Sequence, residues 1–248
     1  MILQKDLIYS LDWDIIIILD ACRYDTLKDA LKHVFLFHSA KKIELEKCRS
    51  LGSCTMEWFT NTFEERIPNS IYISANPYIG NYRNAFQGIE YDPRWIFDSI
   101  RCVWVDSWRK FNGIYCIHPS DVTRVAMVRM KINPRRKFII HYMQPHAPYP
   151  LSPELKQYFT SNINNPEFKL WEALKRGELD PQKARNAYYT NLLWALEYVK
   201  SIVRILRRKK VILTSDHGEC FGERGLYGHP CGKKIPELRD IPWCVITT

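Results

Sequence analysis

The sequence has no long hydrophobic run, which bears on whether the chain could cross a membrane. Its longest purely aliphatic stretch is Ile15–Leu19, and Asp12 and Asp14 precede it. A membrane-spanning helix needs roughly 20 apolar residues. The first residues, MILQKDLIYSLDWD, also lack the charged start, apolar stretch and cleavage site of a secretory signal. We therefore expect no transmembrane segment and a cytoplasmic location.

The eight cysteines form no CxxC pair and show no zinc-finger spacing, which argues against a structural zinc site. Disulfides are rare in reducing cytosol except in some hyperthermophiles. We therefore expect most of the cysteines to be small buried side chains. A bridge such as one between Cys220 and Cys231 is chemically feasible but is not predicted.

Repeats and low-complexity tracts are absent as well. Hydrophobic residues make up 46% of the chain and charged residues 25%, as in ordinary globular proteins. A chain of 248 residues can bury a sizeable core, and we expect residues 1–248 to form one domain.

The formal net charge of +9 indicates an anionic partner, which could be a phosphorylated or sulfated substrate, nucleic acid or an anionic membrane surface. The densest basic run, RILRRKK at 204–210, lies at the end of a predicted helix over about 182–208. Cations at a helix C-terminus favour its dipole and are usually just solvated, which is the simpler interpretation of this run.

Three apolar runs end in polar residues, and they set the expected fold class. The runs at 13–20, 137–142 and 210–214 are typical of buried strands in a parallel sheet. Helical spacing over about 24–34 and 182–208 gives an alternating α/β order, with shorter strands expected at 70–75 and 241–247. Ligands of such sheets bind at the carboxyl ends of the strands. Residues 76–136 show no clean periodicity, and their topology is not predicted.

Acidic residues and a histidine stand at two of these strand ends. Asp216 and His217 directly follow one strand, with Gly218 allowing close backbone approach, and Asp20 ends another. A hard carboxylate beside an imidazole suits a divalent cation. Separately, the pair could hydrogen-bond its own turn and Asp20 could cap a helix. Taken together, a shared metal is the better explanation.

Candidate nucleophiles lie in SLGSCTMEWF, residues 50–59. Ser53, Cys54 and Thr55 precede a helix expected to begin near Met56. A helix N-terminus stabilises an anion and a nearby metal can deprotonate a hydroxyl, although Ser and Thr are also ordinary N-caps.

Histidines supply candidate acids or anion-binding groups. HYMQPHAPYP places His146 in a proline-rich loop beside Tyr149, whereas His141 is expected to pack inside the strand. His229 follows His217 by 12 positions and could return to the same site.

The ordered set LDACRYD, GSCT, PHAPY and SDHGECFGERGLYGHP resembles the sulfatase-like branch of the alkaline phosphatase superfamily, over about 20–60 and 137–246. The resemblance implies a three-layer α/β/α sandwich and a metal held by Asp20, Asp216, His217 and the nucleophile. It also implies that His146 and His229 lie near the transferred group, and that Arg23 in LDACRYD contacts substrate. We expect one ion, zinc or manganese before magnesium or calcium, because no additional Asp-x-x-x-His pair is found.

Departures from the family pattern bear on the nucleophile. Sulfatases carry Cys-x-Pro-Ser-Arg, whose cysteine becomes formylglycine, whereas this chain has Cys54-Thr55-Met56-Glu57-Trp58. Gly52 to Thr55 is closer to the transferases that use threonine. Thr55 is therefore preferred, then Ser53, with a modified Cys54 as an alternative.

The expected function is metal-dependent hydrolysis or transfer of a phosphate, phosphonate or sulfate ester through a hydroxyl nucleophile. The alternative from another class is a non-catalytic nucleic-acid-binding protein that reuses the fold. The substrate and the oligomeric state stay open.

Overall fold

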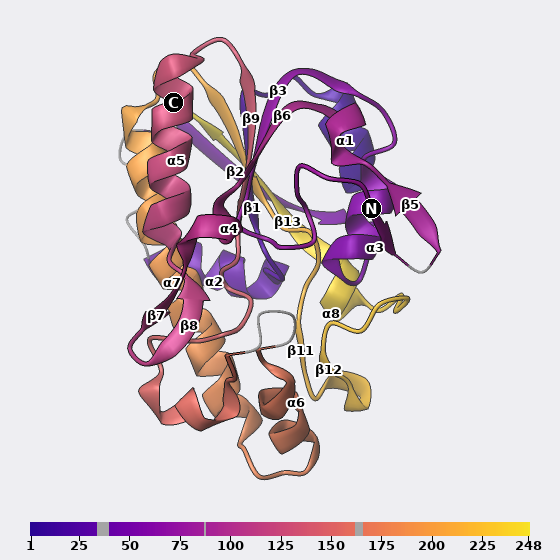
Figure 1. Cartoon of the computed structure of the whole chain (residues 1–248), viewed down its shortest axis with the longest axis vertical. Coiled ribbons are helices and arrows are strands. Elements are labelled where there is room, and N and C mark those ends of the chain that lie inside the picture. Colours follow the sequence, from indigo (N-terminus) through magenta and orange to yellow (C-terminus); the bar gives the residue numbers. More distant parts are fainter. Residues whose placement is uncertain (34–39, 87, 162–165) are drawn as a thin grey trace.

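A seven-stranded sheet forms the centre of the computed structural model, which describes residues 1–33, 40–86, 88–161 and 166–248 (Figure 1). The strand order is β2 (Lys42–Arg49), β13 (Asp240–Thr247), β10 (Lys210–Thr214), β1 (Ile15–Leu19), β9 (Lys137–Tyr142), β3 (Ile67–Ser74) and β6 (Phe97–Cys102). The pairs from β10 to β6 are all parallel, and β13 is antiparallel to both of its neighbours. The expected mostly parallel sheet is confirmed.

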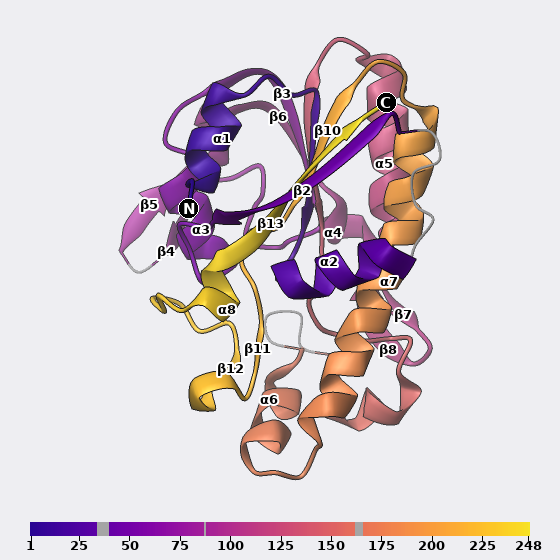
Figure 2. The same ribbon diagram turned by 180° about the vertical axis from the view of Figure 1, so that it is seen from behind.

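Helices cover both faces of this sheet (Figures 1 and 2). Strand β1 shows why, because successive side chains of a strand point to opposite faces. Ile15, Ile17 and Leu19 pack in one core with α2 (Tyr24–His33), α5 (Pro119–Ile132) and α7 (Pro181–Ile205). Ile16 and Ile18 pack in a second core with α1 (Gln4–Ser10) and α3 (Thr55–Thr62). The α/β/α sandwich is therefore confirmed.

The predicted elements match closely where periodicity was clear. Strands 137–142 and 210–214 agree residue for residue, and the long helix ends at Ile205. Val34, included in the predicted helix over 24–34, lies outside the described residues. The unassigned stretch 76–136 holds the edge strand β6 and the helix α5.

The smaller elements lie around the sheet ends. They are β4 (Asn84–Phe86), β5 (Ile89–Tyr91), η1 (Pro93–Trp95), α4 (Val103–Ser107), β7 (Trp108–Phe111), β8 (Ile114–Ile117), η2 (Pro153–Tyr158), α6 (Phe168–Lys175), β11 (Cys220–Phe221), η3 (Glu223–Gly225), β12 (Tyr227–Gly228) and α8 (Pro236–Arg239). A third hydrophobic cluster joins α6 to the first half of α7, beyond the carboxyl ends of the central strands (Figure 1).

One disulfide corrects the cysteine analysis. Cys54 and Cys231 are bonded, although no bridge was predicted and Cys220 was the partner considered for Cys231. The two cysteines lie 177 residues apart in sequence, so spacing alone gave no signal. Cys220 is buried and unpaired, and the other free cysteines are buried or half-buried as expected.

Within the described ranges, we find no helix with the length and apolar character needed to cross a bilayer.

Candidate active site

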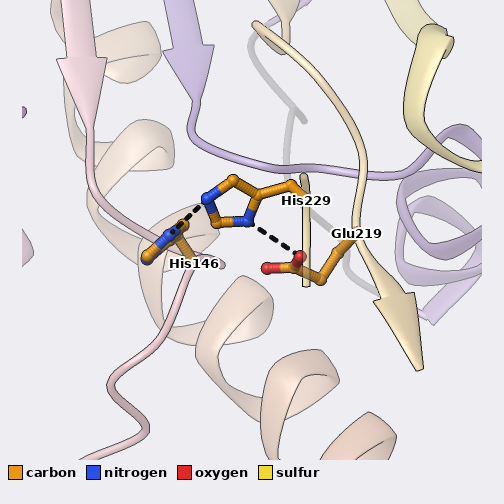
Figure 3. A group of neighbouring side chains, drawn as sticks. All are labelled: His146, Glu219 and His229. Atoms are coloured by element: carbon orange, nitrogen blue, oxygen red, sulfur yellow. Dashed lines mark hydrogen bonds and ion pairs between the residues drawn. The ribbon is translucent and has the colours of Figure 1, made fainter. Parts of the chain in front are cut away.

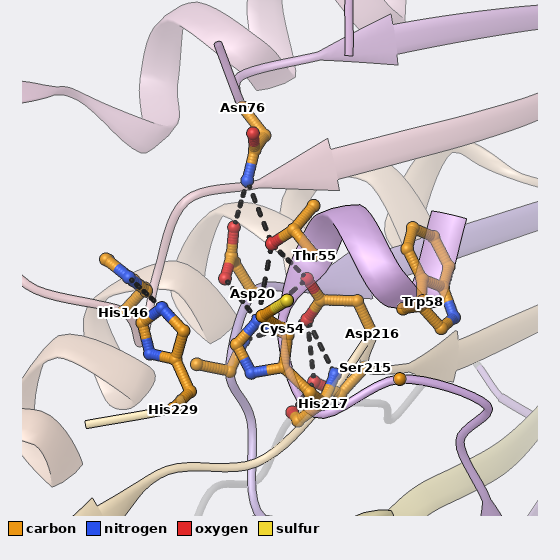
Figure 4. A network of polar contacts seen from close by, with 12 residues as sticks. Asp20, Cys54, Thr55, Trp58, Asn76, His146, Ser215, Asp216, His217 and His229 are labelled. Atoms are coloured by element: carbon orange, nitrogen blue, oxygen red, sulfur yellow. Dashed lines mark hydrogen bonds and ion pairs between the residues drawn. The ribbon is translucent and has the colours of Figure 1, made fainter. Parts of the chain in front are cut away.

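The polar strand ends meet because their strands are neighbours. β10, β1 and β9 lie side by side in parallel, so the residues that follow them share one edge of the sheet. Asp20 follows β1, Asp216 and His217 follow β10, and Thr55 opens α3 beside them (Figure 4). The structure thus brings together the four predicted metal-binding residues.

Their ligand atoms form a tight, buried group, called here the nucleophile cluster after the predicted nucleophile Thr55: Asp20, Thr55, Asp216 and His217. Thr55 Oγ1 donates to Asp216 Oδ2 at 2.8 Å and lies 3.3 Å from His217 Nε2. His217 Nε2 is 3.7 Å from Asp20 Oδ1. Thr55 is 5% exposed and the other three are fully buried. A hydroxyl held this way is aimed at the same point as three potential metal ligands.

Local backbone geometry fixes these side chains. Asp216 Oδ1 accepts hydrogen bonds from the amides of Ala21 and His217, both at 2.9 Å. Ala21 has φ of 57°, a left-handed conformation that is uncommon for a residue with a Cβ. A Cβ on Gly218 would lie 2.1 Å from the carbonyl oxygen of Glu237, so only glycine fits after His217. Such strained and crowded backbone is typical of functional sites.

Two residues of this cluster's surroundings were missed by the sequence analysis. Asn76, just after β3, donates to Asp20 Oδ2 at 2.7 Å and to Thr55 Oγ1 at 3.2 Å. His141 is buried in β9 as expected, yet its Nε2 lies 3.5 Å from Asp20 Oδ2. Asn76 and His141 lie near Asp20 because β9 and β3 are the next strands along the sheet from β1. This strand order cannot be read from the sequence.

The nucleophile cluster fits a divalent cation. Asp20 Oδ1 and His141 Nε2 are buried polar atoms without a hydrogen-bond partner in the described part of the chain. Buried polar atoms are normally satisfied, so such orphans indicate a missing partner. Ligand atoms of Asp20, Asp216 and His217 all lie within 4.8 Å of one another. Oxygen and imidazole donors suit zinc or manganese and allow magnesium or calcium.

The charge states in the cluster follow from burial and neighbours. Burial alone would raise the pKa of Asp20, but His141, His146 and His217 bring the pKa below its ordinary value. Burial lowers the pKa of His217 despite the nearby Asp216. An anionic aspartate beside a neutral imidazole is the form in which both bind metal.

A second group, called here the histidine cluster, consists of His146, Glu219 and His229 (Figure 3). His229 Nδ1 is 2.9 Å from Glu219 Oε1, and His146 Nδ1 is 2.5 Å from the carbonyl oxygen of Ala147. Because these acceptors fix the hydrogen on Nδ1 of each ring, the two Nε2 atoms face each other as lone pairs, 3.4 Å apart. Two facing lone pairs repel each other, so a proton or a cation between the two Nε2 atoms is needed to stabilise this contact.

Acidic neighbours determine which histidine holds a proton. Burial would lower the pKa of His229, but Glu219, Glu167 and Asp20 raise it to about 9. Burial likewise opposes protonation of His146, whose pKa is nevertheless raised by Asp20 and Glu167. Glu219 and Glu167 were missed from sequence, although Glu219 stands within the SDHGE segment. The expected single ion at Asp20, Asp216 and His217 leaves this second group of ligand atoms outside the predicted metal site.

A pocket of about 470 Å³ opens over both clusters. Thr55, Asn76, His146 and His229 line it, together with Tyr78, Tyr82, Trp108 and Glu167. Tyr78 is 47% exposed, and Trp108 Nε1 and Glu167 Oε2 are buried without a partner among the described residues. The pocket therefore offers aromatic faces and unused polar atoms next to Thr55.

The remaining predicted residues lie elsewhere. Ser53 Oγ accepts from the Lys233 amide at 3.0 Å, and its hydrogen is shared between Glu57 Oε2 and the Pro230 carbonyl, each at 2.9 Å. It neither faces the cluster nor caps α3, whose N-cap is Cys54.

Arg23 is held by acidic neighbours outside the pocket. Its guanidinium binds Asp25 and Glu223 and donates to the Glu219 carbonyl, and it does not line the pocket over the nucleophile. In the structure Arg23 therefore supports the segment that carries Glu219, and its contact with substrate stays a prediction.

Known proteins share this fold. No protein-family profile matches the chain. The low-salt glycan biosynthesis sulfotransferase Agl7 of Haloferax volcanii is 29% identical over 153 residues, covering 56% of this chain and 34% of that protein. The chain thus matches about a third of the length of this curated relative.

Two solved structures are similar over most of the chain. The soluble domain of lipooligosaccharide phosphoethanolamine transferase A from Neisseria meningitidis has a TM-score of 0.62 at 15% identity, covering 94% of this chain and 75% of that one. The C-terminal periplasmic domain of EcEptC from Escherichia coli, in complex with Zn, has a TM-score of 0.58 at 12% identity, covering 97% and 74%. The resemblance to the alkaline phosphatase and sulfatase superfamily is confirmed for the fold.

Proposed function

We propose that this protein transfers or hydrolyses a phosphate, phosphonate or sulfate ester, with Thr55 as the nucleophile and a divalent ion bound beside it. One observation carries the proposal. Thr55 is the first residue of helix α3, and its Oγ1 lies 2.8 Å from Asp216 Oδ2 and 3.3 Å from His217 Nε2. The helix N-terminus adds a positive field where an anionic group would sit.

The first half of the reaction follows from these contacts. Thr55 gives its hydroxyl proton to Asp216 Oδ2, to which it already donates, and its oxygen forms a bond to the phosphorus or sulfur atom. The bond from that atom to the leaving oxygen breaks. A divalent ion held by Asp20, Asp216, His217 and Thr55 would lower the pKa of the hydroxyl and offset charge on the equatorial oxygens.

The histidine cluster serves the leaving group. His229, kept protonated by its Nδ1 contact with Glu219, donates its Nε2 proton to the leaving oxygen. His146, whose Nε2 lies 3.4 Å from that atom, helps to bind the anion. In the second half, water or an acceptor hydroxyl gives a proton back to His229 and attacks the Thr55 ester. Thr55 then leaves and recovers its proton from Asp216, which restores the enzyme.

The relatives favour transfer to a sugar-containing acceptor. Agl7 is described as a glycan biosynthesis sulfotransferase and the Neisseria domain as a lipooligosaccharide phosphoethanolamine transferase. The pocket suits such an acceptor because Tyr78, Tyr82 and Trp108 offer flat apolar faces with polar ends. The zinc in the EcEptC domain supports zinc as the ion.

The disulfide bears on two earlier predictions. A sulfur atom bonded to Cys231 is not available for conversion to formylglycine, which disfavours the alternative of a modified Cys54. Structural disulfides are typical of oxidising compartments or of hyperthermophile cytosol. A cytoplasmic location therefore requires the second of these settings. We keep the proposal that residues 1–248 act as one catalytic domain.

Metal analysis combined with a substrate panel tests the proposed function. We expect about one divalent ion at the nucleophile cluster, lost in Asp216→Ala, and turnover of one class among phosphate monoesters, diesters, phosphonates and sulfate esters. Asp14→Ala is the matched control, because Asp14 lies at the opposite end of the sheet and binds Lys209. Equal metal content in wild type and a folded Asp216→Ala variant would remove the central claim.

A further inference from the structure

The end of the molecule opposite the active site combines apolar and basic side chains. A pocket of about 500 Å³ lies between the last turns of α5 and α7, lined mainly by apolar residues such as Met127, Met130, Phe138 and Leu206. Lys131, Arg136, Arg207 and Lys209 also line it, with Asp14 as the single acid. Three aliphatic side chains around it are unusually exposed: Val128 at 51%, Ile132 at 65% and Ile205 at 51%.

The basic residues at this end have few acidic partners. Asp14 accepts from Lys209, and Asp98 lies 3.3 Å from Arg136. Within the ranges that the structure describes, no carboxylate pairs with six further basic residues, Arg129, Lys131, Arg135, Arg204, Arg207 and Arg208. We call these six residues with Val128, Ile132 and Ile205 the basic end. Arg207 donates to the Arg204 and Leu206 carbonyls, as a cation at the C-terminus of α7 is expected to do. The other basic residues, and the exposed aliphatic side chains among them, are not explained by the dipole of α7.

We propose that the basic end docks the protein on an anionic lipid bilayer. Charge complementarity selects this occupant: several unpaired cations attract anionic headgroups, while the exposed aliphatics can enter the boundary between headgroups and acyl chains. Duplex nucleic acid would use the cations but leave Ile132 and Ile205 against a polar backbone. α5 and α7 both end here, so the two helices present the surface on one side of the molecule (Figures 1 and 2).

Docking in this way leaves the catalytic pocket free. Lys137 and Lys210 begin β9 and β10 at the basic end, whereas Asp216 and His217 follow the other end of β10. Strands of this length separate the two ends by about 17 Å or more. The surface would therefore fix where the enzyme works and would not compete with substrate, so the inference does not depend on the reaction.

Vesicle co-sedimentation of the full chain tests the proposal. We expect binding to vesicles of equal parts phosphatidylcholine and phosphatidylglycerol, weakened by salt, and little binding to phosphatidylcholine alone. Arg207→Gln/Arg208→Gln should weaken binding roughly 20- to 30-fold, at about 1 kcal/mol per basic residue near the surface. Lys175→Gln/Arg176→Gln removes the same charge from α6 at the far end and should change it less than about two-fold.

The apolar part has its own test. Ile132→Ser/Ile205→Ser should remove the binding that persists at high salt, because burial of apolar side chains is not screened. Equal effects of the two charge variants would reduce the result to net charge and overturn the proposal. Binding to duplex RNA that depends on Arg207 and Arg208, without vesicle binding, would overturn it in favour of nucleic acid.

Discussion

The two clusters that share the active site are built on different parts of the fold. The nucleophile cluster stands on strand ends and a helix start, and its ligand residues follow β1 and β10 directly. The histidine cluster stands on loops: His146 in the proline-rich segment after β9, Glu219 before β11 and His229 after β12. Strands and a helix fix the positions of the side chains in the nucleophile cluster, whereas contacts with other side chains fix those of the histidine cluster. We therefore expect mutations in the nucleophile cluster to remove a reacting group, and mutations in the histidine cluster to change the protonation of a histidine.

The largest expected effect tests the nucleophile cluster. Thr55→Ala should lower kcat by several orders of magnitude with the fold intact, because it removes the attacking oxygen. Thr55→Ser keeps a hydroxyl and is the matched control, expected to retain measurable turnover. Both are followed by steady-state kinetics and thermal unfolding. Normal turnover by Thr55→Ala would mean that water attacks directly.

The histidine cluster should give a smaller and substrate-dependent loss. His229→Gln is expected to slow turnover roughly 100- to 10,000-fold, the usual range for a positioned general acid. The loss should shrink for esters whose leaving group needs no proton, such as a nitrophenolate. A uniform loss across leaving groups would make His229 a binding residue instead.

The pH dependence of the rate tests whether His229 donates a proton. The pKa of His229 is raised to about 9, so the ring keeps its proton through neutrality and loses it as pH rises through that value. We expect the rate to fall above about pH 9 for esters that need the acid. Glu219→Gln removes the stabilising carboxylate and should move this fall to lower pH. A profile unchanged in Glu219→Gln would contradict proton donation by His229.

The disulfide links the chain segments that carry the two clusters, so its removal should destabilise the fold around them. Cys231→Ser is expected to cost about 2–5 kcal/mol of unfolding free energy, measured with urea. Cys54→Ala should cost a similar amount and keep most activity, and the double variant should add little to either single one. Additive losses, or no response of the wild type to reductant, would show that the bond does not hold the structure.

The smallest effect belongs to Ser53. Ser53→Ala removes hydrogen bonds to the Lys233 amide and the Pro230 carbonyl, so we expect about 1 kcal/mol of lost stability and little change in chemistry. Denaturant unfolding and kcat measure the two parts. A trapped substrate adduct that maps to Ser53 would reverse the assignment of nucleophile.

The central strands and the residues that follow them could be predicted from hydrophobic periodicity and from the polar residues at the strand ends. The runs that end at Asp20 and precede Asp216 are buried, β-branched and bounded by polar residues, which is how parallel strands are recognised. The order of those strands is a tertiary property, so the proximity of Asn76 and His141 was not predictable from the same patterns. Edge strand β2 was missed because it is largely exposed and lacks a continuous apolar run.

The other contacts that were not predicted join residues far apart in the sequence or in different loops. The contact between His229 and Glu219 depends on the short pairing of β11 with β12, and the bond between Cys54 and Cys231 joins opposite parts of the chain. The family resemblance implies that Arg23 contacts substrate, and this stays a prediction. In the fold its charge is used by Asp25 and Glu223, two partners that the sequence alone does not select.

The position of the disulfide also determines what a protease would leave behind. Cys54 and Cys231 close a covalent ring that contains Thr55, His146 and the residues of β10, while Asp20 stays outside it. The segment Lys175–Gly177 is exposed and lies within this ring, so trypsin can cut there. The fragments would remain one molecule on a non-reducing gel and separate only after reduction. A nicked chain of this kind keeps the halves of its active site tethered to each other.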